Sequence, residues 1–379
     1  MLEDFDTGSL VQPLLDWFLT HARPLPWREH VTPYRVWVSE IMLQQTRVEA
    51  VIPYYERFVT VLPDVQSLAS CPEDTLYKLW EGLGYYSRVR NMQKAARIIL
   101  TDFHGCLPGD AMQLQMLPGI GSYTAGAISS IAFGRPVPAV DGNVLRILMR
   151  VSADESDIAK ASVKKRTEAC LRSLMADTFY DAAAEAIPQS PPGSGKDARA
   201  DAMRGPGAFN QALMDLGATL CRPNGAALCE QCPWQRLCLA HARNLTDILP
   251  VKSGAKERRI EERTVLLIER TDEILIRRRP DSGLLAGLYE LPNFTGKLSA
   301  DEAVRLVSGM GLTPLHIEAL PDAKHIFSHI EWHMCGYRIR LDALNPRDVP
   351  YMLFVPVSET KDRYAIPSAF AAYKRFLHD

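Results

Sequence analysis

The chain has 379 residues, which is long for a single hydrophobic core, and its 47% hydrophobic content is enough to fill two or three compact units. The formal net charge is only −2, so overall charge gives no sign of nucleic-acid binding, and any affinity for DNA must come from local sites. The acidic start, Met1 to Asp6, is unlike a signal peptide, and no apolar run approaches the roughly 18 residues of a membrane span. We therefore expect a cytoplasmic multidomain protein that does not associate with membranes. Separately, we expect the protein to be a monomer.

The N-terminal half has the pattern of a helical protein. From Ser9 to about residue 180, amphipathic stretches such as 76–83 and 95–100 are separated by prolines, and no alternating strand pattern occurs. Residues 188–207 are rich in Pro, Gly and Ser, which predicts a flexible loop. A further helix is predicted over 209–220.

One carboxylate, Glu40, lies within the apolar stretch Val36 to Arg47. If this stretch is one helix, Glu40, Gln44 and Arg47 share a narrow polar stripe at i, i+4, i+7 spacing. A partly desolvated carboxyl group has a raised pKa, so it could donate and later accept a proton near neutral pH. The alternative is a solvated surface glutamate with Arg47 as a weak partner.

The stretch Leu117 to Ala125 predicts a helix end, a hairpin bracketed by Gly119 and Gly121, and the start of a second helix. Such a hairpin can offer backbone N–H groups at a helix N-terminus to a DNA phosphate without using net charge. The alternative is a turn that only joins two helices.

A second candidate carboxylate, Asp141, follows an apolar segment and precedes Gly142-Asn143. It could be a helix N-cap and nothing more, or an ionised group placed to stabilise a cationic transition state. Together with Glu40 it gives the two-carboxylate arrangement of glycosidic bond cleavage, with one group acting as acid and the other stabilising an oxocarbenium ion.

Four of the eight cysteines lie between residues 221 and 238, with the spacing Cys221-x7-Cys229-x2-Cys232-x5-Cys238. Four thiolates in so short a segment predict a metal site in a reducing compartment, and the spacing alone does not separate zinc from an iron–sulfur cluster. The basic residues around them could contact phosphates, or could only make the loop soluble; they are Arg222, Arg236, His241 and Arg243.

The C-terminal third has a different periodicity and predicts a separate α+β unit. The charged segment 252–263 is interpreted as a linker. The predicted elements are strands at 265–268, 274–276 and 331–341, a helix at 302–307, and a terminal helix from Pro367 to about Leu377.

Six stretches resemble the MutY-type adenine DNA glycosylases, nearly collinearly over almost the whole chain. They are Leu25–Arg28, Ser39–Thr46, Gly82–Tyr86, Leu117–Ala127, Asp141–Asn143 and Phe209–Gly217. The resemblance implies a helix-hairpin-helix glycosylase, one [4Fe–4S] cluster on the four cysteines, and removal of adenine opposite 8-oxoguanine or guanine in double-stranded DNA. It also implies a bacterial-type enzyme that associates with the nucleoid when acting on DNA.

The domains implied are a six-helix barrel with the hairpin at 25–134 and a helical cluster domain at 1–24 and 135–240 that carries the catalytic Asp. A linker at 241–261 and a Nudix-like domain at 262–379, which recognises 8-oxoguanine, complete the chain.

The resemblance also implies residue roles. Glu40 would protonate adenine and handle the water, Asp141 would stabilise the cation, and Tyr123 and Asn143 would orient these two groups. Residues implied to contact DNA or a base are Arg28, Gln45, Thr46, Tyr85, Gly119, Gly121, Phe327, Ser328 and His329. Ser328 would hydrogen-bond the lesion.

Two sequence differences bear on the alternatives. The related endonuclease-three-type enzymes carry a nucleophilic lysine where this chain has Tyr123, which cannot form a Schiff base, so we expect a monofunctional glycosylase rather than a glycosylase/lyase. A Nudix hydrolase needs a glutamate-rich helix for Mg²⁺, and here Arg305 and Leu306 replace the paired glutamates, which disfavours a nucleotide hydrolase.

A non-catalytic lesion sensor is the remaining alternative. A metal triad of His325, His329 and His333 on one strand face is disfavoured because no Cys or acidic cluster accompanies it.

Overall fold

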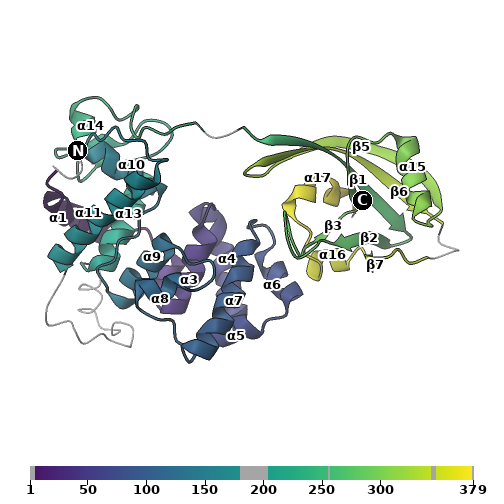
Figure 1. The fold of residues 1–379 in the computed structure, drawn as a ribbon, viewed down its shortest axis with the longest axis horizontal. Coiled ribbons are helices and arrows are strands. Elements are labelled where there is room, and N and C mark those ends of the chain that lie inside the picture. The colour runs from purple at the N-terminus through teal and green to yellow at the C-terminus, as the bar shows by residue number, and fades with distance from the viewer. Residues whose placement is uncertain (1–4, 180–203, 255–256, 343–346, 378–379) are drawn as a thin grey trace. The chain divides into compact units, whose positions relative to one another are not determined.

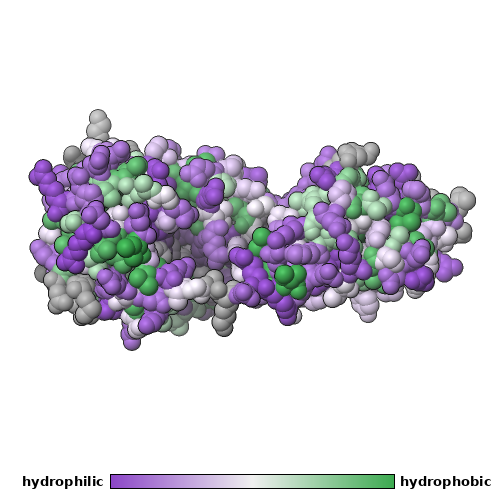
Figure 2. All heavy atoms as spheres, turned by 90° about the horizontal axis from the view of Figure 1, so that it is seen from above, coloured by the Kyte–Doolittle hydropathy of each residue, from purple (hydrophilic) through white to green (hydrophobic). Residues whose placement is uncertain are grey.

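The computed structural model describes residues 5–179, 204–254, 257–342 and 347–377 (Figure 1). The chain divides into two compact units: Met1–Ser70 with Asn91–Gly254, and Cys71–Arg90 with Ala255–Asp379. The first is helical, whereas the second contains a mixed β-sheet. On the face shown in Figure 2, hydrophilic residues cover most of each unit and hydrophobic residues form only small patches. No helix in the described ranges is long and apolar enough to cross a membrane.

The helical pattern predicted for the N-terminal half is confirmed, and no strand occurs among the described residues before Arg259. The helices of the first unit are α1 (Val11–His21), α2 (Pro26–Glu29), α3 (Pro33–Leu43), α4 (Val48–Val61), α5 (Val65–Ser70), α7 (Ser87–Asp102, whose first residues belong to the second unit), α8 (Ala111–Gln115), α9 (Ser122–Phe133), α10 (Gly142–Val151), α11 (Ala161–Phe179), α13 (Pro206–Thr219) and α14 (Leu239–Ala242).

Helices α3 and α9 form the centre of the part of the unit that carries Glu40. Trp37 and Val38 on α3 have no exposed surface, as expected for a helix that is apolar on most sides. α9 packs against both α3 and α13. A Cβ on Gly126 of α9 would lie 2.1 Å from the Pro138 carbonyl oxygen, so glycine is required for the close approach of the segment that leads to Asp141.

The predicted polar stripe of Glu40, Gln44 and Arg47 is wrong, because α3 ends at Leu43. Gln45 has a left-handed backbone with φ of 58°, and α4 begins at Val48, so residues 44–47 form a turn between two helices. The helix breaks where a non-glycine residue adopts this costly conformation, which hydrophobic periodicity does not reveal. Gln45 is exposed and Thr46 is partly exposed on this turn.

The second unit contains α6 (Glu73–Trp80) and a seven-stranded sheet of order β3-β2-β1-β6-β5, with β4 paired to β1 and β7 to β2. β1 and β6 are parallel and the other pairs are antiparallel. The strands are β1 (Arg259–Arg270), β2 (Glu273–Arg278), β3 (Tyr289–Glu290), β4 (Asn293–Thr295), β5 (Pro314–Ile326), β6 (Ile330–Leu341) and β7 (Met352–Pro356).

Alternating residues of β1 face two different cores. Val265 and Leu267 pack in one core with the C-terminal helical turns, including α17 (Ala371–Lys374). Leu266 and Ile268 pack in the other core with α15 (Ala300–Gly309). The predicted α+β unit is therefore confirmed as a sheet covered on both faces.

Four details of the sequence predictions change. Residues 259–263 of the expected linker are the start of β1, and the expected terminal helix consists of the short turns 368–370, α17 and 375–377. β3, β4, β5 and β7 were not predicted; β5 is a largely exposed edge strand that contains Pro321, so it lacks a clear alternation of buried residues. Most of the loop predicted at 188–207 lies outside the described residues, and α13 already begins at Pro206.

Candidate active site

Glu40 lies on the buried part of α3 and is only 4% exposed. Burial raises the pKa of Glu40 to about 7, a hydrogen bond from Tyr123 and the charge of Arg28 lower it, and the charge of Asp141 raises it. Its Oε2 atom has no hydrogen-bond partner among the described residues. Glu40 is thus not the solvated surface glutamate of the alternative interpretation: it is a desolvated acid that can exchange a proton near neutral pH.

Tyr123 follows the first residue of α9, whose N-cap is Gly121. Its hydroxyl has two acceptors within reach, the Glu40 carboxyl and the Met214 sulfur at 3.7 Å. A thioether is a weak acceptor, so the ionised carboxylate is the stronger partner. Burial, followed by the charges of Glu40 and Asp141, raises the pKa of Tyr123 well above its usual value, so the phenol remains a proton donor.

Asp141 is the N-cap of α10, and its Oδ1 accepts hydrogen bonds from the backbone N–H groups of Asn143 (2.9 Å) and Val144 (2.8 Å). The Asn143 side-chain amide donates to the second oxygen, Oδ2, at 2.8 Å. Asp141 is also close enough to Glu40 to act on its pKa. The cap therefore holds the carboxylate in one orientation beside Glu40, and the two alternatives offered by the sequence are compatible.

Asp215 on α13 was missed by the sequence analysis. It has no exposed side-chain surface and pairs with Arg23 and Arg28, each at 2.7 Å. Burial opposes its ionisation, but the hydrogen bonds and charges of the two arginines hold the pKa of Asp215 below its ordinary value. The pair fixes the guanidinium of Arg28 near Glu40. The sequence signal that could have revealed Asp215 is a carboxylate within the helical stretch 206–219. If that part of the helix is buried, the carboxylate needs a charged or hydrogen-bonding partner.

Arg146 on α10 connects the Asp141 cap to the cysteine segment. Its Nη1 donates to the Asn143 side-chain oxygen at 2.9 Å, its Nε to the Cys221 carbonyl at 3.0 Å, and its Nη2 to the Gly217 carbonyl at 2.9 Å. The sequence analysis did not single out this residue. Its position three residues after Asn143, on the same side of α10, was the available signal.

The predicted hairpin joins α8 to α9. Gly119 has φ of +82°, and a Cβ there would lie 2.9 Å from Asn91 Cβ, so both the conformation and the space require glycine. A Cβ on Gly121 would meet no atom within 4 Å, which leaves the N-terminus of α9 approachable. The first N–H groups of a helix have no partner within that helix, so this helix start is suited to bind a phosphate.

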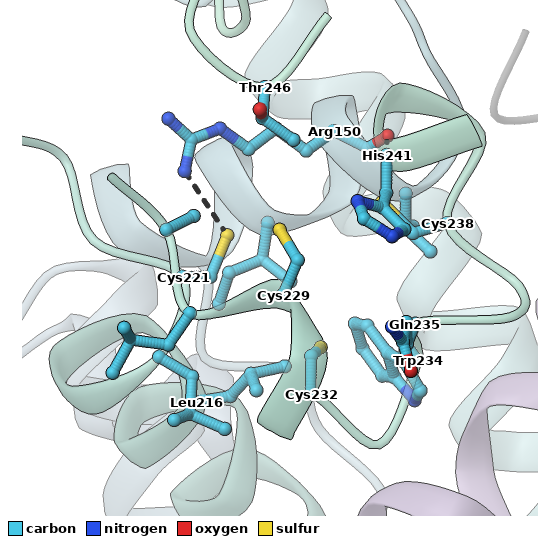
Figure 3. A pocket seen from close by; sticks show the side chains of 15 residues that line it. Arg150, Leu216, Cys221, Cys229, Cys232, Trp234, Gln235, Cys238, His241 and Thr246 are labelled. Atoms are coloured by element: carbon cyan, nitrogen blue, oxygen red, sulfur yellow. Dashed lines mark hydrogen bonds between the residues drawn. The ribbon is translucent and has the colours of Figure 1, made fainter. Parts of the chain in front are cut away.

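The four clustered cysteines line one pocket together with Arg150, Trp234 and His241 (Figure 3). Arg150 is buried and donates to the Cys221 sulfur at 3.4 Å and to the Arg222 carbonyl at 2.9 Å. The first interval, residues 222–228, forms a loop in which Gly225 has φ of +78° and the Leu228 N–H bonds the Leu220 carbonyl at 3.0 Å. The structure thus places all four cysteines around one pocket.

The donor set fits an iron–sulfur cluster. Thiolates are the usual ligands of such clusters, and a guanidinium that donates to a ligand sulfur helps to balance their charge. Among the described residues, no three His, Cys, Asp or Glu side chains converge on one point as the ligands of a single ion do.

In the second unit, Tyr85 and Ser328 lie side by side. Tyr85 has the left-handed φ of 46° and is 47% exposed, and its hydroxyl is 3.0 Å from the Ser328 hydroxyl. Phe327, Ser328 and His329 form the tight turn between β5 and β6, closed by a hydrogen bond from the Phe327 N–H to the Ile330 carbonyl at 2.8 Å. The resemblance implies that both residues contact DNA or a base, and the structure places their hydroxyls in hydrogen-bond distance of each other.

The histidines near this turn do not share one strand face as supposed. His325 is on β5 and contacts the Phe327 ring, with ring centroids 4.6 Å apart, His329 is in the turn, and His333 on β6 bonds Glu331 at 2.7 Å.

The acidic residues of the Nudix-like part are used for structure. Glu302 closes a capping box with Ser299 at the start of α15. The buried Glu290 accepts hydrogen bonds from Arg277, Arg279 and Asn293.

Comparison with known proteins matches two parts of the chain to families. Residues 38–173 match the HhH-GPD superfamily base excision DNA repair proteins, and residues 264–375 match the NUDIX domain. The chain is 34% identical to the adenine DNA glycosylase of Rattus norvegicus, with 90% of this chain and 72% of the relative aligned, and 35% identical to that of Mus musculus, with 89% and 72% aligned. A solved thermostable thymine-DNA glycosylase aligns with 62% of this chain and 96% of its own at 24% identity, with a TM-score of 0.48. The chain, a helix-hairpin-helix region followed by a Nudix-like domain, belongs to the family of adenine DNA glycosylases.

Proposed function

We propose that this protein is a base excision repair glycosylase that hydrolyses the N-glycosidic bond of adenine opposite 8-oxoguanine or guanine in double-stranded DNA. The observation that carries the proposal is the buried Glu40, whose pKa is raised to about 7 beside the capped carboxylate Asp141. Two carboxyl groups of different environment supply an acid and an ionised stabiliser for glycosidic cleavage. Family membership supplies the substrate class.

In this mechanism adenine leaves the base stack so that Glu40 can reach it. Glu40 donates its proton to the base at N7, the bond from C1′ to the base nitrogen breaks with its electron pair leaving on adenine, and Asp141 stabilises the oxocarbenium ion. Glu40, now ionised, accepts a proton from water as the water attacks C1′. Tyr123 orients Glu40, and Asn143 orients Asp141.

The other residues bind DNA or the base in this proposal. Arg28, fixed by Asp215, lines the adenine pocket, and Gly119 and Gly121 present N–H groups to a phosphate. Gln45 and Thr46, on the turn after α3, enter the duplex near the mispair. On the opposite strand Tyr85 stacks beside 8-oxoguanine, while Ser328 and its neighbours Phe327 and His329 test the lesion.

A [4Fe–4S] cluster on Cys221, Cys229, Cys232 and Cys238 is part of the proposal. When bound, the cluster supplies four metal–thiolate bonds that hold the loop between α13 and α14 in place. Arg150 supports the sulfur of Cys221, and Arg146 bonds its carbonyl. We further propose that the enzyme acts as a monomer in the cytoplasm.

The test is single-turnover release of adenine from duplexes that carry adenine opposite 8-oxoguanine, guanine or thymine, with strand integrity measured before and after alkali. The proposal expects fastest release opposite 8-oxoguanine and intact strands until alkali is added. Tight mispair binding without release would support a lesion sensor instead. Strand cleavage before alkali would support a glycosylase/lyase in which a lysine elsewhere in the chain acts as nucleophile.

A further inference from the structure

Within the second unit, residues 71–90 are fixed to the Nudix-like domain by ion pairs at both ends of α6. Glu73 at the N-terminal end pairs with Arg278 of β2 at 2.8 Å. Glu81, directly after the helix, pairs with Lys374 of α17 at 2.7 Å, and both side chains are about three-quarters buried. Lys78, which pairs with Glu81, also donates to the Thr360 carbonyl at 3.3 Å.

Arg90 makes the central contact. Its guanidinium donates to the Tyr77 hydroxyl at 3.0 Å, to the Asp281 carbonyl at 3.4 Å and to the Ala286 carbonyl. Gly287, with φ of +73°, lies so near that a Cβ there would be 3.4 Å from the Tyr77 hydroxyl and 3.5 Å from Arg90 Nη2. The loop 281–287 is therefore closed over one arginine that is distant in sequence.

The segment fixed in this way ends in the Tyr85 turn. Trp80 donates its indole N–H to the Gly84 carbonyl at 3.1 Å, and Arg88 donates to the Leu83 carbonyl at 2.8 Å. The Arg88 guanidinium lies 5.2 Å from the Trp80 ring centre and 5.7 Å from the Tyr85 ring centre. The strained backbone of Tyr85 is thus stabilised by its surroundings, with its hydroxyl held at Ser328.

We propose that Arg90, Glu73 and Glu81 are positioning residues that fix Tyr85 against Ser328 and so set the preference for the base opposite adenine. The inference rests on the proposed function, in which Tyr85 and Ser328 contact 8-oxoguanine. Their direct hydrogen bond means that the two contacts are assembled before DNA binds. Preassembly reduces the entropic cost of ordering these contacts when DNA binds. Loss of the contacts that fix residues 71–90 to the Nudix-like domain, here called docking, therefore weakens lesion recognition while Glu40 and Asp141 stay unchanged.

The test compares Arg90→Ala, Arg90→Lys and a matched control, Arg270→Ala, in the full-length protein. Arg270 is a partly buried arginine of the same unit, but it pairs with Glu273 at the end of β1 opposite to the end that contacts His329. The readout is the ratio of single-turnover adenine-release rates opposite 8-oxoguanine and opposite guanine.

We expect Arg90→Ala to lower this ratio about tenfold, the effect of losing roughly one hydrogen bond to the lesion, with release opposite guanine nearly unchanged. Arg90→Lys should restore part of the ratio, and Arg270→Ala should retain it. An unchanged ratio in Arg90→Ala, or an equal fall of both rates, would overturn the proposal. A purely structural role predicts the equal fall.

The ion pair permits a charge-exchange test. Glu73→Arg and Arg278→Glu should each lower the ratio, and the double variant should recover most of it, because the pair is re-formed with reversed charges. No recovery in the double variant would count against a role for this pair.

Hydrogen exchange of the DNA-free protein separates failure of this inference from failure of the proposed function. The N–H of Gly287 bonds the Pro280 carbonyl at 3.0 Å, so Arg90→Ala should speed hydrogen exchange at the Gly287 amide. In Arg270→Ala, exchange at this amide should be the same as in wild type. If wild type shows no preference for 8-oxoguanine but exchange responds, the docking stands and the proposed function fails. If exchange does not respond, the docking is refuted whatever the substrate.

Discussion

Asp215 and Arg28 share two hydrogen bonds, with Nη1 2.7 Å from Oδ2 and Nη2 3.0 Å from Oδ1, although 187 residues separate them in sequence. Arg23 adds a third bond, from its Nε to Oδ1 at 2.8 Å. This carboxylate joins α13 to α2 and to the segment before it, and it fixes the position of Arg28, whose charge lowers the pKa of Glu40. The pair therefore serves both stability and the charge balance of the site.

Asp215→Asn should destabilise the helical unit by about 3 kcal/mol, because it leaves two partly buried arginines without a counter-charge. Urea unfolding followed by circular dichroism measures this loss. Lys164→Ala is the control: it removes a half-exposed ion pair with Glu168 and should cost less than about 1 kcal/mol. Equal effects of the two changes would contradict the role assigned to Asp215.

Glu40→Gln should lower single-turnover adenine release by about 10²-fold or more, since the amide cannot donate the proton, while DNA affinity changes little. Glu29→Gln, at an exposed glutamate of α2, is the matched control and should retain wild-type release. Affinity for mispaired DNA is measured alongside by fluorescence anisotropy. A parallel loss of affinity and release would remove Glu40 from the chemical step.

The release rate should fall above about pH 7, because the acid form of Glu40 is needed and its pKa is about 7. Tyr123→Phe removes a hydrogen bond that lowers this pKa, so the midpoint of the pH–rate profile should move to higher pH. Tyr54→Phe on α4 should leave the midpoint in place. A midpoint that does not move in Tyr123→Phe would assign the profile to another group.

Stability should also depend on Glu40. Its pKa is about 7 in the folded protein and 4.5 ordinarily, so folding takes up a proton between these values and the free energy of unfolding falls as pH rises from 4.5 to 7. The loss is about 3 kcal/mol and is complete above pH 7. Glu40→Gln should therefore be more stable than wild type at pH 8 and nearly equal at pH 5. Equal stability at pH 8 would mean that Glu40 is not desolvated.

The sequence predicted the elements whose pattern is local. Periodicity indicated the helical region and the α+β unit, and the spacing of Cys221 to Cys238 indicated one shared pocket. The burial of Glu40 was open from sequence, because it depends on α9, which packs over it from 80 residues away. Asp215, the end of α3 and the exposed strand β5 were missed for the same reason: each depends on partners or backbone strain that local pattern does not contain.

The parallel pairing of β1 with β6 constrains the order in which the chain acquires its structure. Arg259 pairs with Ile330 and Glu269 with Arg340, so the central pair of the sheet cannot form until about residue 341 has left the ribosome. Residues 71–90 are synthesised long before the strands and α17 that they contact. Until synthesis is almost complete this segment lacks its final partners, and the nascent chain is most exposed to misassembly there.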